Sequence, residues 1–171
     1  MDVDKVALRV RGYAGDFAKV KYSDFQVVDA LNCALRLLAE TSAQGGKALF
    51  RRSDECSVVA GVFSLPDDFV SPVRAYGADG AELLILSESS PADEGEVLIH
   101  GEKGYTGETA VSLVYNALPE EVEALTEEID LSAAWELPLS RAAAMFLVGD
   151  ASGAAKTLAA FFGGGNGGDS Q

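Results

Sequence analysis

The sequence predicts an α+β fold: a mainly helical bundle core with a small antiparallel β insertion. Two observations support this prediction. Apolar residues recur at helical spacing near both ends of the chain, and its middle is rich in β-branched residues between glycine-containing turns. With 171 residues, 48% of them hydrophobic, the chain can form a packed core. We assign residues 1–56 and 119–162 to the helical core, residues 57–118 to the inserted β unit, and residues 163–171 to a flexible, glycine-rich C-terminal tail.

Two helices are expected before the β insertion. Valines at positions 3, 6 and 10 predict a short helix over residues 3–14, ended by the sequence GYAGD. Ser23, with Gln26 three positions later, fits a capping box at the start of a long second helix. The broad apolar face of this helix suggests contacts with more than one neighbour, in a core or in an assembly. The residues that define this core or assembly helix are Val28, Leu31, Leu35 and Leu38.

Four strand-like segments define the β insertion. They follow a β-branched stretch that begins at Cys56, and they cover residues 69–76, 82–86, 96–100 and 109–118. The sequences GADG, PADEG and GEKGYTG between them have turn composition, and Asp79–Gly80 indicates a tight hairpin. We therefore expect a small antiparallel unit.

The helical pattern returns after residue 118. Pro138 lacks a backbone donor and clashes deep inside a helix, so we expect it to open a helix over residues 138–148. Asp150 or Ser152 is then expected to cap a last helix. The side chains expected to be buried together between the two helical parts are Val28, Leu31, Leu35, Met145 and Phe146.

Phe161 and Phe162 end the last helix, directly before the glycine-rich tail. Adjacent residues of a helix point in different directions, so both rings cannot face one core. One interpretation is that the spare phenylalanine docks into a pocket of a partner protein. The other is that both rings simply close the last helix.

The composition argues against several classes of function. A net charge of −14 and a pI near 4.3 do not suit a protein that grips nucleic acid or an anionic membrane surface. The longest apolar runs are far shorter than the ~20 residues of a membrane span. Cys33 and Cys56 are too few for a disulfide framework or a metal site. We expect both thiols to be reduced, with Cys33 packed inside a helix and Cys56 in a loop.

Catalytic signals are weak. His100 is the only histidine, and at the end of an apolar strand-like segment a surface or packing role is more common than that of a base. The neighbours Asp67 and Asp68 are expected to diverge, whereas an acid–base pair must converge across a substrate. No G-x-S-x-G motif occurs, and GEKGYTG lacks the spacing of a phosphate-binding loop. We therefore expect a binding or structural protein, with no catalytic residues, no cofactor and no bound metal.

Several motifs, taken in their order along the chain, resemble those of the head-to-tail adaptor (head-tail connector) proteins of tailed bacteriophages. The first three are Gly15–Asp16, Tyr22–Ser23–Asp24 and Leu31–Asn32–Cys33–Ala34. The sequence LPDDF within residues 63–76 is similar to the strand entry of that family. Residues 112–150, with an LP turn, an acidic loop and the sequence IDL, are similar to its return into the helical core. Ser132 stands where a proline is common in the family.

This resemblance implies a structural virion protein. Such a protein binds the portal protein as a ring of about twelve copies, connects it to a tail protein (a nozzle or tail-completion protein), and lies in the neck at the head-tail junction. Phe161 and Phe162 are the candidate portal-binding residues. DNA passes through the ring without specific binding, which suits an acidic channel wall. The chain is expected in the host cytoplasm before assembly, with no membrane partner.

Two alternatives share these local signals. A monomeric α+β interaction or regulatory module would have the same motifs without self-association. A virion-associated wall-degrading enzyme would need a convergent pair of acidic residues.

Overall fold

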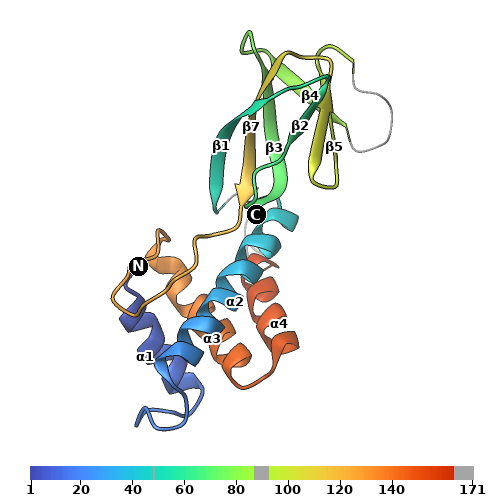
Figure 1. The fold of residues 1–171 in the computed structure, drawn as a ribbon. Helices are drawn as coiled ribbons and strands as arrows, with labels where there is room; N and C mark the ends of the chain where they lie inside the picture. Colours follow the sequence, from blue (N-terminus) through green and yellow to red (C-terminus); the bar gives the residue numbers. More distant parts are fainter. Residues whose placement is uncertain (48, 87–92, 164–171) are drawn as a thin grey trace, which may run out of the picture. The chain divides into compact units, whose positions relative to one another are not determined.

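The computed structural model describes residues 1–47, 49–86 and 93–163, which form two compact units (Figure 1). Unit 1 combines Met1–Lys47 with the chain from Pro119 onward, and unit 2 is the continuous stretch Ala48–Leu118. The described residues contain four α-helices, all in unit 1, and seven strands, all in unit 2.

The predicted fold class is therefore wrong in its proportions and in its sheet. Helices account for 38% and strands for 28% of the described residues, so the protein is not mainly a helical bundle with a small insertion. The sheet is mixed and nearly closed into a barrel, and it is not purely antiparallel. Its first strand begins at Arg51, inside the range that was expected to be helical. That strand reads RRSDECS, and six of its seven residues face solvent, so it lacks the apolar alternation of a typical strand.

Unit 1 is built around its third helix, which packs against the other three. The helices are α1 (Val3–Tyr13), α2 (Asp24–Gln44), α3 (Glu136–Leu147), preceded by the 3-10 turn η1 (Ala133–Trp135), and α4 (Ala151–Gly163). The predicted capping box at the start of α2 is present: Ser23 accepts a hydrogen bond from the Gln26 N–H, and the Gln26 side chain accepts one from the Ser23 N–H. The Asp2 carboxylate caps α1 in a similar way.

The second helical part starts earlier than predicted. Helix α3 begins at Glu136, and Pro138 lies in its first turn, where no intrahelical donor is required of it. The Asp150 carboxylate accepts a 2.8 Å hydrogen bond from the Gly153 N–H, so Asp150 caps α4. Gly163 is the last residue of α4, so the helix extends into the range that was expected to be a flexible tail. The rest of that tail, residues 164–171, lies outside the described residues.

The core of unit 1 contains smaller side chains than predicted. Val28, Leu31 and Leu35 are buried, but Met145 and Phe146 are only partly buried. Because α3 must approach three helices at once, most of its central face consists of small residues, which allow close packing. These fully buried positions of α3 are Leu139, Ser140, Ala142, Ala143 and Ala144.

Unit 2 is a single seven-stranded sheet with strand order β1-β7-β3-β4-β5-β6-β2. Neighbouring strands are antiparallel except β4 and β5, which are parallel. The strands are β1 (Arg51–Ser57), β2 (Val62–Ser64), β3 (Phe69–Gly77), β4 (Glu82–Leu86), β5 (Glu96–His100), β6 (Lys103–Thr106) and β7 (Ala110–Ala117). The predicted hairpin lies between β3 and β4, where Gly80 has a φ of 82° that suits glycine.

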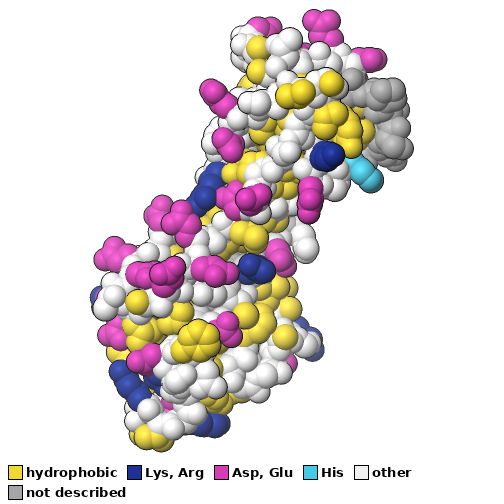
Figure 2. Space-filling model, in the orientation of Figure 1, with side chains coloured by type: hydrophobic (Ala, Val, Ile, Leu, Met, Phe, Trp, Pro, Cys, Tyr) yellow, Lys and Arg dark blue, Asp and Glu magenta, His cyan; other side chains and the backbone are white. Residues whose placement is uncertain are grey.

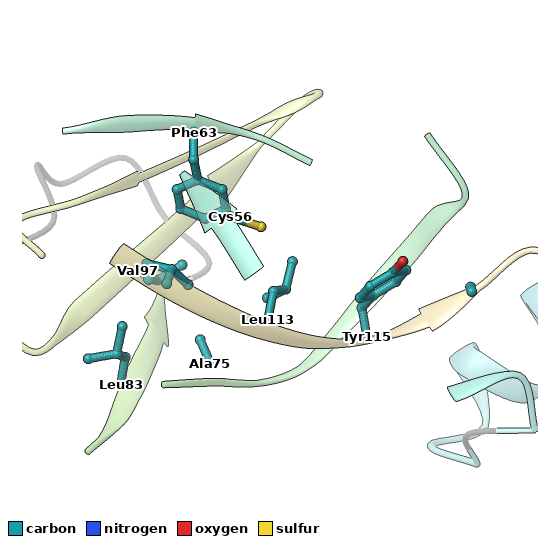
Figure 3. Close-up of a cluster of buried hydrophobic side chains, with 9 residues drawn as sticks. Cys56, Phe63, Ala75, Leu83, Val97, Leu113 and Tyr115 are labelled. Atoms are coloured by element: carbon teal, nitrogen blue, oxygen red, sulfur yellow. The ribbon is translucent and has the colours of Figure 1, made fainter. Parts of the chain in front are cut away.

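The interior of unit 2 is filled by one apolar cluster (Figure 3). Its members come from six of the seven strands and include Cys56, Phe63, Leu83, Val97 and Leu113. The Phe63 ring lies directly over the backbone of Gly104 on the neighbouring strand β6. A Cβ at position 104 would lie 2.0 Å from Phe63 Cζ, so only glycine leaves room for the ring there.

Cys33 lies in a helix as predicted, but its predicted packing and the predicted loop position of Cys56 are wrong. Cys33, expected to pack inside a helix, is on the exposed side of α2, and Cys56, expected in a loop, is buried in β1. Burial raises the pKa of the Cys56 thiol, and nearby Asp54 adds to this effect. Partial burial also raises the pKa of the Cys33 thiol, with a further contribution from Asp29.

Candidate functional site

The predicted core or assembly helix presents no free apolar face. Val28, Leu31, Leu35 and Leu38 are all buried, and the other helices of unit 1 cover α2 on that side. Asn32 of the LNCA motif ties α2 to the chain that returns from unit 2. Its side-chain amide donates to the Val122 carbonyl and its amide oxygen accepts from the Val122 N–H, both at 2.9 Å. These residues hold unit 1 together.

A buried charge cluster organises the loop between α1 and α2 (residues 14–23, called here the α1–α2 loop). The Arg11 side chain is only 3% exposed and reaches three acceptors. Its Nη1 donates to Asp16 Oδ2 and to the Tyr22 carbonyl, each at 2.7 Å, and its Nη2 donates to Asp24 Oδ1 at 2.6 Å. Arg11 therefore connects both ends of the loop to α1.

Asp16 holds the loop from the other side. Its carboxylate accepts hydrogen bonds from the backbone N–H groups of Val20 (2.9 Å), Lys21 (2.9 Å) and Tyr22 (3.2 Å). These bonds, of which that from Lys21 contributes most, lower the pKa of Asp16 below its ordinary value; burial of the carboxylate opposes them, and Arg11 reinforces them. The loop is thus fixed by an ionised carboxylate within its own turn, and Lys19 takes a left-handed conformation with φ 54°.

This rigid loop displays apolar side chains to solvent. Phe17 and Val20 are each 84% exposed, and Phe25, in the first turn of α2, is 79% exposed. One edge of the Phe17 ring lies close to Gly12 of α1. A Cβ added at Gly12 would be 3.1 Å from the Cε1 atom of Phe17. We call Phe17, Val20 and Phe25, together with the intervening Lys19 and Lys21, the apolar-basic tip.

A second feature of unit 1 has the opposite charge. The segment 119–130, called here the acidic segment, carries six acidic and no basic side chains. Val122 and Ile129 anchor it by burial. The Glu127 carboxylate accepts hydrogen bonds from the N–H groups of Glu123 and Ala124. Figure 2 shows carboxylates gathered over this part of unit 1, where the chain follows β7, and basic side chains at the end that carries the α1–α2 loop.

Phe161 and Phe162, the predicted docking residues, both contact the same tryptophan. The ring centroid of Trp135 lies 4.8 Å from that of Phe161 and 5.1 Å from that of Phe162. Lys47 Nζ lies 5.5 Å from the centroid of the Phe162 ring. Phe161 nevertheless stays 47% exposed, so one side of its ring is accessible to a partner.

In unit 2, the LPDDF motif places one carboxylate in a hydrogen-bond network. The Tyr115 hydroxyl donates to Asp68 Oδ1 at 2.9 Å, and Arg52 Nη1 donates to Asp68 Oδ2 at 2.8 Å. Burial raises the pKa of Tyr115 to about 12, with the hydrogen bond to Asp68 as the next contribution. Asp68 thereby joins β1 and β7 to the turn that precedes β3.

The residues considered for chemistry do not form a recognisable active site. His100 is exposed at the end of β5. Asp67 is exposed and lines a shallow hollow, whereas Asp68 is occupied by Tyr115 and Arg52. Within residues 1–47, 49–86 and 93–163, no group of three or more His, Cys, Asp or Glu side chains could hold a metal ion. In the same part of the chain, no helix combines the length and the apolar character needed to cross a bilayer.

Sequence reasoning did not identify Arg11 or Trp135. A signal for Arg11 existed: it follows Ala7 by four residues on the buried face of α1, and a charge on such a face requires partners. Asp16 lies five residues later. Trp135 gave no signal, because its partners on α4 are more than twenty residues away.

A comparison of the chain with protein-family models finds no match, and neither does a comparison with curated proteins.

Proposed function

We propose that this chain is a head-to-tail adaptor of a tailed bacteriophage. In this role it is a non-enzymatic structural protein of the virion that binds the portal protein as a ring, connects the portal to a tail protein, and forms part of the channel for DNA. The chain is in the host cytoplasm before assembly and at the head-tail junction of the virion afterwards.

The observation that carries the proposal is the role of the residues behind the family resemblance. Each motif supplies a contact that organises the fold: Asp16 fixes the α1–α2 loop, Ser23 caps α2, Asn32 binds the returning chain, and Asp68 binds Tyr115. Motifs that recur for their contacts, in the same order along a chain, are expected where two proteins share a scaffold. The resemblance thus rests on residues with physical roles.

The charge distribution also supports the proposal. Unit 2 has four basic and twelve acidic side chains, a net charge of −8, and unit 1 has nine basic and fifteen acidic ones, a net charge of −6. Repeated around a ring, such a chain lines a channel with negative charge, which repels the DNA phosphates instead of binding them.

The test uses the purified full chain and the portal protein from the same genome. Light scattering on the mixture should show a complex with about twelve copies on the portal, and electron microscopy should show a ring beneath it. The chain alone should be mostly monomeric, because its net charge of −14 opposes unassisted association at low salt. A chain that never binds the portal, or a stable dimer that ignores it, contradicts the proposal.

A further inference from the structure

The apolar-basic tip has the features of a binding surface, and the rest of unit 1 does not cover it. Phe17, Val20 and Phe25 are the three most exposed large apolar side chains of unit 1. Phe17 and Val20 sit on a loop whose conformation the Arg11–Asp16 cluster already fixes, and Phe25 follows it in the first turn of α2. A preordered loop loses little conformational entropy on binding, and exposed aromatic side chains are frequent anchors of interfaces.

The charge around this tip selects its partner. Between residues 5 and 23 the chain carries five basic side chains and one acidic one. Lys5 and Arg9 pair with Asp2 and Glu136, and Arg11 pairs with Asp16 and Asp24, so the positive charge of the tip comes from Lys19 and Lys21. Lys19 and Lys21, which flank Val20, are exposed. The complementary surface is present on the same protein, because the acidic segment carries six carboxylates and no basic residue. Since the two surfaces lie at different places on unit 1 (Figure 2), they can meet between two copies of the chain.

We infer that the apolar-basic tip of one copy binds the acidic segment of the next copy. This contact is head-to-tail: each copy offers one surface on each side, and such contacts close into rings when the rotation allows it. The inference rests on the proposed adaptor function and deepens it by naming the contact between neighbouring copies. The receiving surface also offers apolar area, because Leu125 and Leu131 are only partly buried.

The experiment combines charge reversal with mixing of variants. Lys19→Glu with Lys21→Glu reverses the charge of the tip. Glu123→Lys with Glu128→Lys reverses two of the six charges of the acidic segment and leaves Glu127, which bonds the local backbone, unchanged. A matched control for the tip variant, Lys103→Glu with Lys156→Glu, adds the same net negative charge at exposed residues that do not belong to the tip. Circular dichroism and melting curves verify that all variants fold as the wild type does.

Each chain is titrated against the portal, and the copies per portal are counted by native mass spectrometry. We expect each reversed variant to need at least about tenfold more protein than the wild type or the control to fill the ring. An equimolar mixture of the two reversed variants should recover filling, because their altered surfaces are again complementary. Phe17→Ala with Val20→Ala should weaken filling at both low and high salt, since that contact is apolar.

The outcomes separate this inference from the proposed function. If the wild-type chain does not bind the portal at all, the adaptor function fails. If the wild type forms rings and both reversed variants fill them equally well, only the copy-to-copy contact is wrong. If the tip variant does not bind the portal even as a single copy, the tip contacts the portal and not a neighbouring copy, and the inference is overturned. Binding of the tip to anionic vesicles, with ring filling unchanged, also overturns it.

Discussion

Unit 1 and unit 2 place their buried polar groups differently. In unit 1, Arg11 is almost completely buried and is matched by two carboxylates and a carbonyl. In unit 2, the comparable network around Asp68 lies near the surface, and Arg52 at its end is substantially exposed. The core of unit 2 depends instead on the close fit of Phe63 over Gly104. Unit 1 therefore depends on a charge balance, and unit 2 on shape.

The difference also has a functional side. The charge cluster of unit 1 fixes a loop that displays apolar side chains. The Asp68 network of unit 2 instead joins two strands to a turn. The more demanding polar arrangement thus lies beneath the surface we assign to binding.

The largest effect should come from removing the charge at the centre of unit 1. Arg11→Met leaves Asp16 without its ionic partner, and breaking a buried ion pair from one side costs about 3–5 kcal/mol of unfolding free energy. Hydrogen exchange resolved by peptide should show lost protection in α1 and α2 with little change in unit 2. The matched control is Arg9→Met, which removes the exposed ion pair with Glu136 and should cost at most about 1 kcal/mol. Equal losses for both variants contradict the assigned importance of the buried cluster.

Unit 2 should respond most to a change of shape. Gly104→Ala forces the Phe63 ring out of its place, and overpacking of this kind costs about 1–3 kcal/mol of unfolding free energy. Loss of protection in β2 and β6, with unit 1 unchanged, is the expected exchange pattern. Ser64→Ala, at an exposed position on β2, serves as the control. The double variant Phe63→Leu with Gly104→Ala should recover part of the loss, and purely additive effects count against a direct contact.

The two units should lose folding stability at opposite ends of the pH scale. The pKa of Asp16 is lowered in the fold, so its contribution to stability is present above its ordinary value of 3.8 and is lost as the pH falls below it. The pKa of Tyr115 is raised from 10.0 to about 12, so its contribution is present below pH 10.0 and is lost as the pH rises toward 12.

Separate probes can follow these two transitions. Trp135 is the only tryptophan and lies in unit 1, so its fluorescence reports acid unfolding there. The alkaline loss in unit 2 is followed by circular dichroism, and Tyr115→Phe should remove the part that depends on this hydroxyl. An alkaline transition that is identical in Tyr115→Phe assigns the loss to other groups.

The smallest effect on stability is expected at the end of α4. Phe161→Ala removes one ring contact with Trp135 and should cost about 0.5–1.5 kcal/mol. If Phe161 is also an anchor for the portal, binding to the portal should fall much more than stability does. Phe162→Ala is the matched variant, because Phe162 contacts both Trp135 and Lys47 and is more buried. A loss of portal binding that only follows the loss of stability in both variants assigns the two rings to the fold.

The parts of the fold that could be predicted are those with local causes. The capping box at Ser23, the hairpin at Gly80 and the apolar face of α2 each follow from residues within a few positions of one another. The parallel pairing of β4 with β5 and the position of β7 between β1 and β3 depend on long-range packing, which no short pattern encodes. Strand β1 was missed because an edge strand can carry charges on both faces.

The candidate surface shows the same limit. The motif residues Asp16 and Tyr22–Ser23–Asp24 were recognised, but their convergence on Arg11 needed the structure. The exposure of Phe17 and Val20 was also invisible, because an apolar residue in a sequence is normally assigned to a core.

The interruption of unit 1 by unit 2 sets an order for folding during synthesis. All residues of unit 2 have been made when position 118 is reached, but α3 and α4 follow only later. At ~5–20 residues per second, the ribosome needs roughly 2–9 seconds more to complete α4. During that interval α1 and α2 have no α3 against which to bury their valines and leucines. The nascent chain thus carries all residues of the β unit and a helical pair whose apolar face is still open. That face is where a chaperone would bind or where neighbouring chains on a polysome would aggregate.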